Sequence, residues 1–379
     1  MATAPRHTQP LPPRNQLPAQ TGSSGSLLAA IAATSTRNTR FSQHLGDYEL
    51  KETLGRGGFA VVRRAQSLSA GSFGVQVAIK MIDKRLMHQA NMTKRVVNEV
   101  HIHCQLKHPS ILQLLTFFED DRHVYLVMEL CENGELYRYL QKRKSLSEAE
   151  TRGVMVQIIS GLEYLHSNRI VHRDLKLSNL LLTRNYEIKI ADFGLAAKLA
   201  HHDGEQQTMC GTPNYISPEI VSCEPHGLPS DVWSLGCLMA TILTGKPPFE
   251  SKAVRDTLDR VTRAEYSLPD TLSSDAADLI HRMLQKEPYK RISLSEAMRH
   301  SFFAPKSGKT VPLGPPDLPY SEDAHVVVDE HAARQSSRNI EPRITKSRRA
   351  DEEALPETQL ACEYPRMLLW ATRRDIVTG

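Results

Sequence analysis

The sequence lacks the features that mark several common protein classes. Its six cysteines form no CxxC pair and no regular framework, which favours free thiols in a reducing compartment over disulfides or a zinc site. Its longest apolar run, "VWSLGCLMATILTG" from Val232, is shorter than the roughly 20 residues that span a bilayer, and no secretory signal is present. We therefore expect a cytoplasmic protein with no membrane partner.

An excess of one charge is also absent. The 47 lysines and arginines and the 43 aspartates and glutamates leave a formal net charge of +4. The only basic cluster is the short run "KSRR" at residues 346–349, and basic and aromatic side chains do not gather elsewhere. Because nucleic-acid binding by a folded surface needs such gathering, we expect no nucleic-acid partner.

Acidic residues are missing from the first 46 positions, which are rich in proline, serine, threonine and alanine. Arginines without acids also occur in mitochondrial transit peptides, but the early prolines interrupt any amphipathic helix. We therefore expect a disordered tail over 1–46. Prolines and charges return without periodicity after about residue 304, and there we expect a second, mostly disordered tail over 304–379.

The middle of the chain changes from strand-type to helix-type patterns. The segments "DYELKETLG", "VVRRA", "VQVAIKM" and "VYLVMEL" are separated by glycine-containing turns and predict an antiparallel sheet. In "SLSEAE", Ser147 and Glu150 form a capping-box pattern that predicts the start of a helix. Further helices are predicted at 229–244, 273–285 and 293–300, so the fold class is α+β.

Glycines cluster in "LGRGGFAVV" at Gly55, Gly57 and Gly58. Such a cluster forms ordinary hairpins as well as phosphate sites. A dinucleotide-binding loop of the Rossmann type would lead from a strand into a helix, whereas here a second strand follows. A glycine-rich hairpin whose backbone N–H groups approach phosphate oxygens remains possible on this pattern.

Four further polar groups have two interpretations each. Lys80, on the apolar strand "VQVAIKM", either extends to solvent or enters a cleft, and Glu99 either pairs with Arg95 on the surface or holds Lys80. Asp192 in "ADFG" is either a turn residue or a metal ligand. Asp174 belongs to "RIVHRDLKLSNLLLT", which is either a surface turn or a loop that carries polar groups to the floor of a cleft.

The order of these motifs narrows the interpretations. A glycine-rich hairpin, a strand lysine, a helix glutamate, "HRDLKLSN", "DFG" and "SPE" follow one another, and in this order they resemble the protein kinases over residues 47–303. The resemblance implies a bilobal α+β fold. Its small antiparallel-sheet N-lobe, with one main helix, would cover about 47–130, and its larger, mainly helical C-lobe about 131–303.

The resemblance also assigns roles to residues. Asp174 would orient or accept the proton of the acceptor hydroxyl, and Lys176 would neutralise charge on the transferred phosphoryl group. Lys80, held by Glu99, would contact the phosphates of ATP. Asn179 and Asp192 would hold Mg²⁺. The remaining nucleotide-binding positions would be Leu54, Gly55, Gly57, Gly58, Phe59, Ala60, Val62, Ala78, Glu129, Cys131 and Leu181, with Met128 as gatekeeper.

Finer features are similar to one branch of the family. Lys176 and "GTPNY" at 211–215 resemble the serine/threonine class, and Ala60 at the third-glycine position resembles the polo-like kinases. "NEVHIHCQLKHPSIL" and "CGTPNYISPEI" resemble the Sak-type branch, the kinases of centriole duplication. This implies protein substrates bearing Ser or Thr, self-association for trans-autophosphorylation and a centrosomal or centriolar location. No polo-box domain is evident after residue 304.

The resemblance further implies two structural contacts and a switch. Asp231 would brace the catalytic loop, and Arg291 would pair with Glu219. Phosphate on Thr208 would pair with Arg173 and order the segment between "DFG" and "SPE". Thr212 would stay unmodified and contact Asp174 and Lys176. The alternative function is a pseudokinase or truncated kinase form acting as an interaction scaffold, which loss of Lys80, Asp174, Asn179 or Asp192 would mark; all four are present.

Overall fold

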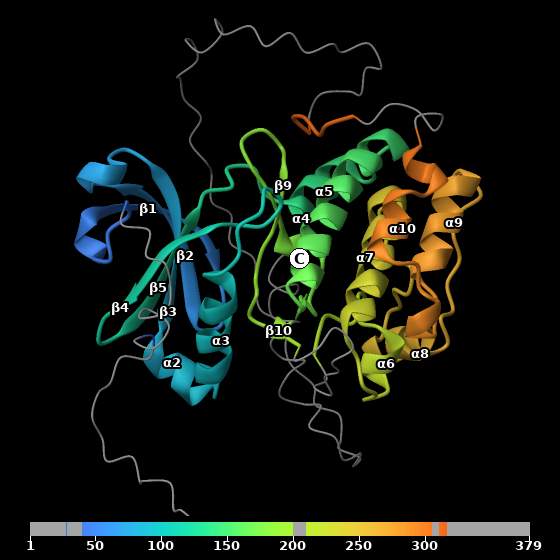
Figure 1. The fold of residues 1–379 in the computed structure, drawn as a ribbon, viewed down its shortest axis with the longest axis horizontal. Coiled ribbons are helices and arrows are strands. Elements are labelled where there is room, and N and C mark those ends of the chain that lie inside the picture. Colours follow the sequence, from blue (N-terminus) through green and yellow to red (C-terminus); the bar gives the residue numbers. More distant parts are fainter. Residues whose placement is uncertain (1–27, 29–39, 200–209, 305–310, 317–379) are drawn as a thin grey trace, which may run out of the picture.

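The computed structural model describes Leu28 and residues 40–199, 210–304 and 311–316, and these residues form two lobes (Figure 1). The smaller lobe is built on a five-stranded antiparallel sheet in the order β1-β2-β3-β5-β4. Its strands are β1 (Tyr48–Arg56), β2 (Ala60–Ser67), β3 (Gln76–Asp83), β4 (Leu114–Glu119) and β5 (His123–Glu129). The predicted bilobal α+β fold is thereby confirmed.

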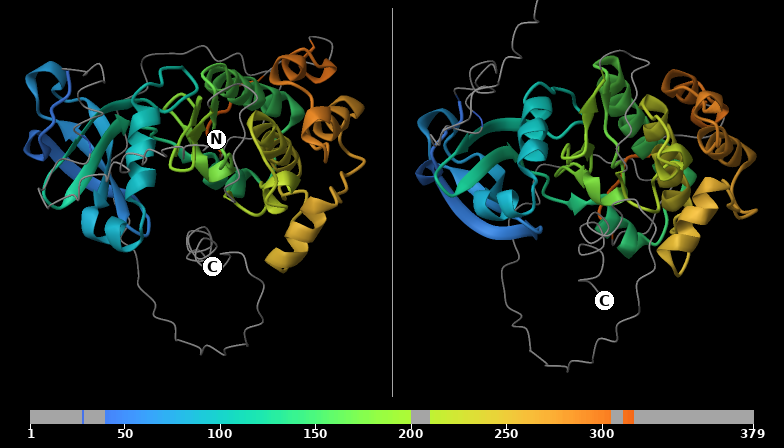
Figure 2. Two further views of the ribbon diagram at one scale, coloured as in Figure 1. Left: turned by 60° about the horizontal axis from the view of Figure 1, so that its bottom comes forward. Right: turned by 90° about the horizontal axis from the view of Figure 1, so that it is seen from below.

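Alternation along β3 divides the small lobe into two apolar clusters. Val77 and Ile79 face one side of the sheet and are fully buried, whereas Ile82 faces the other side. That second side is covered by α2 (Lys84–Gln89) and α3 (Thr93–His103). Figure 2 shows α3 between the sheet and the larger lobe. The sheet thus presents α3 to the cleft between the lobes.

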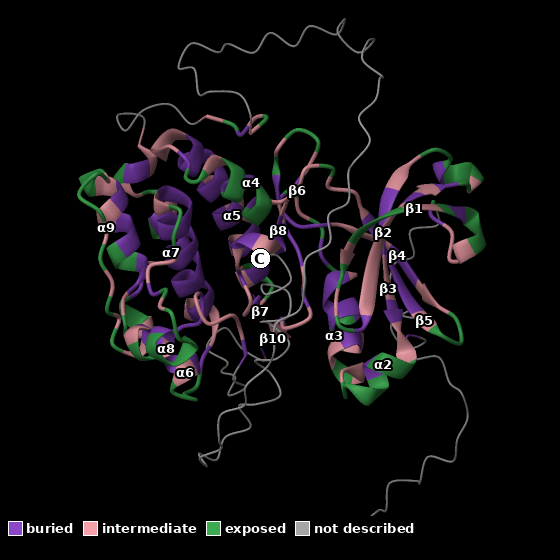
Figure 3. Cartoon of the chain, turned by 180° about the vertical axis from the view of Figure 1, so that it is seen from behind, coloured by how far each residue is buried: buried purple, intermediate pink, exposed green. Residues whose placement is uncertain are grey.

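The larger lobe packs around α7 (Leu228–Thr244), whose residues are buried almost all round (Figure 3). A helix that is apolar on every side is stable only in the middle of a core. Around it lie α5 (Glu148–Ser167), α9 (Ser274–Met283) and α10 (Leu294–Met298), and α4 (Leu136–Arg143), α6 (Pro218–Val221) and α8 (Val254–Thr262) complete the helices. The short strands are β6 (Gly134–Glu135), β7 (Ile170–Val171), β8 (Leu180–Leu182), β9 (Ile188–Ile190) and β10 (Ala197–Lys198).

Local sequence patterns placed the main helices. The predicted capping box is present: the amide N–H of Glu150 donates to Ser147 Oγ at 3.2 Å, and the amide N–H of Ser147 donates to Glu150 Oε2 at 2.9 Å. A second capping box, between Ser293 and Glu296, starts α10 and was not predicted. Among the helices that the structure describes, none is long and apolar enough to cross a bilayer.

Packing on the small lobe begins before the boundary predicted at residue 46. Phe41 is 7 % exposed in the cluster of Val77 and Ile79, and Leu28 is 2 % exposed in the cluster beneath α3. Composition describes a whole segment and does not reveal a single apolar side chain that finds a pocket, so this part of the expected tail is corrected. The rest of 1–46 and most of 304–379 lie outside the described residues.

Candidate active site

One buried carboxylate holds the backbone of the segment that precedes Asp174. Asp231, in α7, is fully buried, and its two oxygens accept the backbone N–H groups of His172 and Arg173 at 2.9 Å each. His166 Nε2 lies 2.9 Å from Asp231 Oδ2. Burial alone would raise the pKa of Asp231, but the bond from His166 and the nearby His172 hold this pKa below its usual value. The predicted bracing contact is therefore present.

Asp174 lies at the centre of a network of polar side chains. Thr212 Oγ1 donates to Asp174 Oδ1 at 2.8 Å, and Lys176 Nζ donates to Thr212 Oγ1 at 2.9 Å. Lys176 Nζ also lies 3.1 Å from Asp174 Oδ2, and Asn179 Nδ2 donates to the Asp174 carbonyl at 2.8 Å. The carboxylate is thus fixed in orientation, with an ammonium group beside it. Such a group can orient an acceptor hydroxyl and take its proton.

Lys80 and Glu99 connect β3 to α3. Lys80 Nζ lies 2.6 Å from Glu99 Oε1, and the two side chains are 19 % and 7 % exposed. The predicted pairing of Glu99 with Lys80 is therefore present. The pair places a positive charge in the cleft below the glycine-rich hairpin, where phosphate groups would be attracted.

The ring of Phe193 lies between two histidine rings, one from each lobe. The Phe193 ring is buried between His103, at 4.8 Å between ring centroids, and His172, at 5.4 Å. Burial lowers the pKa of His103 to about 4, and its Nε2 lies 2.6 Å from the Leu112 carbonyl. His103 is therefore neutral near pH 7. This arrangement of rings was not predicted from the sequence, because its members are distant along the chain.

The predicted Mg²⁺ ligands lie beside two paired strands: Asn179 directly precedes β8, and Asp192 follows β9 by two residues. The amide N–H of Ala191 donates to the Asn179 carbonyl at 2.8 Å, which ties the strand before Asp192 to the catalytic loop. Because Asn179 Nδ2 donates to Asp174, its amide oxygen is the end available to a metal. A carboxylate and an amide oxygen are hard ligands that suit Mg²⁺, so the residues present fit this ion.

An apolar pocket floor lies at the hinge between the lobes. Leu112, Met128 and Ala191 form a cluster against which Cys131 and Leu181 pack. Burial, and then the charge of Glu129, raises the pKa of the Cys131 thiol to about 12, so it stays neutral. The Glu129 carboxylate is engaged elsewhere, accepting the Gln113 amide N–H at 2.7 Å and pairing with Lys189 at 3.0 Å.

The upper wall of this pocket is the β1–β2 hairpin. Leu54 is 41 % exposed, Gly55 pairs with Val62, Val62 pairs with Lys80, and Ala78 pairs with Met128 in the sheet register. The turn itself is closed by a bond of 2.7 Å from the Gly57 amide N–H to the Ala60 carbonyl. At Gly55 an added Cβ would meet no atom within 4 Å, which leaves room below the hairpin. These contacts bring the expected pocket residues together.

Phe59 differs from the other expected pocket residues. It is 7 % exposed and lies in the apolar cluster with α2 and α3, and its carbonyl accepts the Asp83 amide N–H at 2.9 Å. Its side chain therefore fixes the tip of the glycine-rich hairpin to the small lobe. Motif position does not specify which way an aromatic side chain turns, because that depends on the apolar cavity available.

Arg173 lies beside a basic cavity. Its backbone has φ +65°, its Nε donates to the Leu195 carbonyl at 2.7 Å, and its Nη1 is buried with no hydrogen-bond partner within the described part of the chain. The cavity has a volume of about 140 Å³ and is lined by Lys94, Arg95, Asn98, Arg173, Gly194, Leu195, Ala196 and Cys210. No carboxylate lines it among these residues. Thr208 lies outside the described residues.

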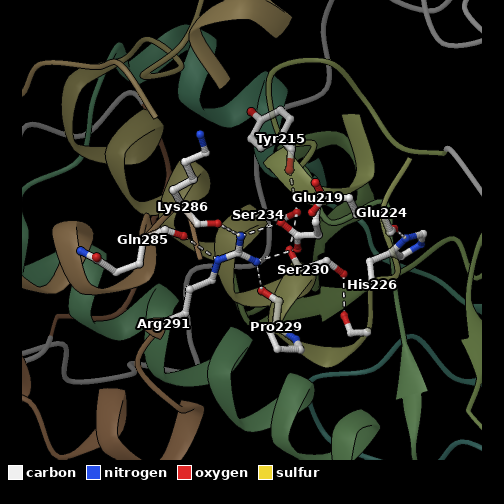
Figure 4. A network of polar contacts seen from close by, with 11 residues as sticks. Tyr215, Glu219, Glu224, His226, Pro229, Ser230, Ser234, Gln285, Lys286 and Arg291 are labelled. Carbon is white, nitrogen blue, oxygen red and sulfur yellow. Dashed lines mark hydrogen bonds and ion pairs between the residues drawn. The ribbon is translucent and has the colours of Figure 1, made fainter. Parts of the chain in front are cut away.

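The predicted pair of Arg291 and Glu219 is present and deeply buried (Figure 4). Both guanidinium Nη atoms lie 2.7 Å from a carboxylate oxygen of Glu219, and the two side chains are 1 % and 2 % exposed. Arg291 also donates to the Pro229 carbonyl at 2.9 Å, and its guanidinium lies 5.2 Å from the centre of the Trp233 ring. This pair anchors the end of the segment that carries Thr212.

Comparison with known proteins agrees with this geometry. The family model described as "Protein kinase domain" matches residues 48–303. The chain belongs to the protein kinase family. It is 54% identical over 266 residues to serine/threonine-protein kinase PLK4 of Nematostella vectensis, covering 69% of this chain and 27% of that protein. Similarity to the PLK4 proteins confirms the predicted resemblance to the Sak-type branch of the polo-like kinases.

Two further relatives give the same picture. The chain is 54% identical over 263 residues to PLK4 of Aedes aegypti, covering 69% of this chain and 34% of that protein. It is 53% identical over 257 residues to PLK4 of Xenopus laevis, covering 68% and 27%. The chain thus spans about a third or less of the length of the curated relatives it matches.

Proposed function

We propose that this protein transfers the γ-phosphoryl group of ATP to serine or threonine side chains of other proteins. The observation that carries the proposal is the joint presence of the Asp174–Thr212–Lys176 network in the larger lobe and the Lys80–Glu99 pair in the smaller lobe. Protein kinases require both at once. A pseudokinase or scaffold has no need for this coincidence, so that alternative is not favoured.

The residues divide the work between the lobes. Lys80 would contact the α and β phosphates of ATP, and the backbone of the hinge at Glu129 and Cys131 would contact the adenine. Asp174 would orient the acceptor hydroxyl and take its proton, while Lys176 would stabilise charge on the transferred group. Asn179 and Asp192 would hold Mg²⁺, which when bound supplies positive charge to the phosphate oxygens.

The acceptor class follows from the C-lobe residues. Lys176 lies beside Asp174 and bonds to Thr212, an arrangement that places an ammonium group close to the acceptor hydroxyl. In the family this pattern is typical of serine/threonine kinases.

The experiment is transfer of label from ATP, with Mg²⁺ present, to a generic protein acceptor. The wild-type chain should label the acceptor, and Asp174→Asn should be slower by at least about a hundredfold, since a positioned base contributes factors of this size. Hydrolysed product should contain phosphoserine and phosphothreonine. Equal labelling by both chains would contradict the catalytic assignment, and a majority of phosphotyrosine would contradict the acceptor class.

We also propose how the enzyme is switched on. Phosphate on Thr208 would bring a charge of about −1.5 to −2 to the basic cavity of Arg173, Lys94 and Arg95. Its oxygens would accept from the buried Arg173 Nη1. We expect the kinase to modify Thr208 itself, by self-association in trans. Mass spectrometry of active protein finding Thr208 unmodified, together with full activity of Thr208→Ala, would rule this out.

The biological role proposed from the resemblance is centriole duplication. Its support is the similarity of residues 48–303 to PLK4 proteins and to the Sak-type pattern. The corresponding location would be the centrosome. A fluorescently tagged chain that never coincides with a centriole marker in dividing cells would remove this part of the proposal and leave the kinase activity unaffected.

A further inference from the structure

Leu28 is separated from the kinase domain in sequence, yet it is among the most buried residues of the small lobe. It is 2 % exposed. It belongs to the apolar cluster that also contains Phe59 of the glycine-rich hairpin, Met87 of α2, and Val96 and Val100 of α3. One side chain from the N-terminal segment thus shares a cluster with the elements that border the nucleotide pocket.

A polar contact accompanies this apolar one. The amide N–H of Leu28 donates to Glu119 Oε1 at 3.1 Å, and Lys84 Nζ lies 2.6 Å from Glu119 Oε2. The Glu119 and Lys84 side chains are only 11 % and 19 % exposed. The apolar cluster and the Glu119 carboxylate at its edge together suit a leucine residue. The cluster buries the side chain, and the carboxylate accepts a hydrogen bond from the backbone N–H.

The near end of the segment is fixed on the other face of the sheet. Phe41 is buried in the cluster of Tyr48, Val77 and Tyr125, and Arg40 Nε donates to the Gly71 carbonyl at 3.1 Å. Alternation of Tyr125 and Leu126 along β5 places the Phe41 and Leu28 clusters on opposite faces. The N-terminal segment is therefore anchored at two points, and the tether keeps Leu28 at a high effective concentration near its cavity.

We propose that the face bounded by α2, α3 and β4 is a docking site for an apolar side chain, and that the chain's own Leu28 occupies it and holds α3 in place. Val96 and Val100 of α3 flank Glu99, the residue that reaches Lys80. Without Leu28 a cavity would open beneath Val96 and Val100, and packing against one side of α3 would be lost. Leu28 is then a positioning residue, acting on the phosphate-binding Lys80 through α3. This last step rests on the proposed kinase function, whereas the docking itself does not.

The test uses the full chain with four variants. Leu28→Asp places a charge in the cluster, and Leu28→Ala truncates the side chain without adding charge. Leu28→Ile is the conservative variant, and Leu68→Asp is the matched control, because Leu68 of the small lobe is 45 % exposed. Hydrogen exchange is followed in α3, with α7 as the reference. Leu28→Asp should speed exchange in α3 by about fivefold or more, since a loss of this kind corresponds to a modest local destabilisation. Leu28→Ile and Leu68→Asp should exchange like wild type.

A kinetic readout separates positioning from bulk stability. The KM for ATP should rise several-fold in Leu28→Asp, whereas Leu28→Ile should have the KM of the wild-type chain. Unchanged hydrogen exchange in α3 of Leu28→Asp, or an equal effect of Leu68→Asp, would overturn the docking site. If Leu28→Asp also speeds hydrogen exchange in α7, the Leu28→Ala variant decides the question. Faster exchange confined to α3 in Leu28→Ala would support the docking site, and wild-type exchange in α3 would overturn it. The two proposals can fail separately. If Leu28→Asp speeds exchange in α3 alone while the wild-type chain transfers no phosphate, the docking site stands and the kinase function is rejected.

Discussion

The two lobes differ in how they hold the groups they contribute to the cleft. The C-lobe has one continuous apolar core around α7, and it fixes Asp174 through the fully buried Asp231 and the segment of Thr212 through the buried Arg291–Glu219 pair. The N-lobe core is split by its sheet into two smaller clusters, and it holds Lys80 through Glu99, whose side chain is 7 % exposed. We infer that the C-lobe is the rigid platform for chemistry and the N-lobe the adjustable holder of the nucleotide.

The largest expected effect tests the rigid side of this comparison. Arg291→Met would leave the Glu219 carboxylate buried without its partner, which typically costs about 3–5 kcal/mol and should lower Tm by roughly 10 °C. Arg282→Met, which removes a pair whose side chains are 58% and 48% exposed, should cost less than about 1 kcal/mol. Thermal unfolding of both variants measures the difference. Equal losses would show that the buried pair does not anchor the C-lobe.

A second prediction concerns chemistry on that platform. Thr212→Ala removes the hydroxyl that bonds both Asp174 and Lys176, so activity should fall by about a hundredfold or more. Thr208→Ala should only lower activity, because it removes a switch and not a contact at the carboxylate. Steady-state rates and circular dichroism of folded protein provide the measurement. A Thr212→Ala chain as active as Thr208→Ala would show that the hydroxyl does not orient Asp174.

The third prediction concerns pH and the contact between the lobes. Burial lowers the His103 pKa from 6.5 to about 4, so the unfolded chain binds a proton between these values and the folded chain does not. Stability should therefore fall as pH decreases from 7 to 5, by about 2 kcal/mol from this group. In His103→Leu that part of the pH dependence should vanish. Denaturant unfolding of wild type and His103→Leu at pH 7 and pH 5 measures this. If the free energy of unfolding falls equally with pH in both chains, His103 is not the cause.

The smallest expected effect tests the adjustable side. Glu99→Gln weakens the hold on Lys80 while keeping the side-chain shape, so we expect about a tenfold rise in KM for ATP. Because this pair is not part of the C-lobe core, Tm should change by less than about 2 °C. His101→Gln, at an exposed position on the same helix, is the control. A large fall in Tm with unchanged KM would reverse the roles we give to the two lobes.

Much of the site could be predicted because its motifs are local and ordered. A capping box such as Ser147 and Glu150 lies within four residues, and the motifs around Asp174 and Asp192 are each contiguous. The Arg291–Glu219 pair was predicted only through the family resemblance, since 72 positions separate its members. Neither composition nor periodicity indicates such a contact.

What could not be predicted depends on cavities that only the folded lobes create. Phe59 turns into the apolar cluster under α3, Leu28 fills the same cluster, and His103 is kept neutral against Phe193. In each case the side chain meets residues far away in sequence. The N-terminal segment is the clearest example, because its composition predicts disorder while two of its apolar residues are packed on the N-lobe.

The most direct test of the division between the lobes is to measure ATP binding and phosphoryl transfer in the same variant. Asp174→Asn alters only the C-lobe network, so calorimetry with Mg²⁺ and ATP should give a Kd within about threefold of wild type, while transfer falls by at least about a hundredfold. Lys80→Met should instead weaken the binding. An Asp174→Asn chain that loses ATP binding, or that transfers phosphate at the wild-type rate, would contradict the account.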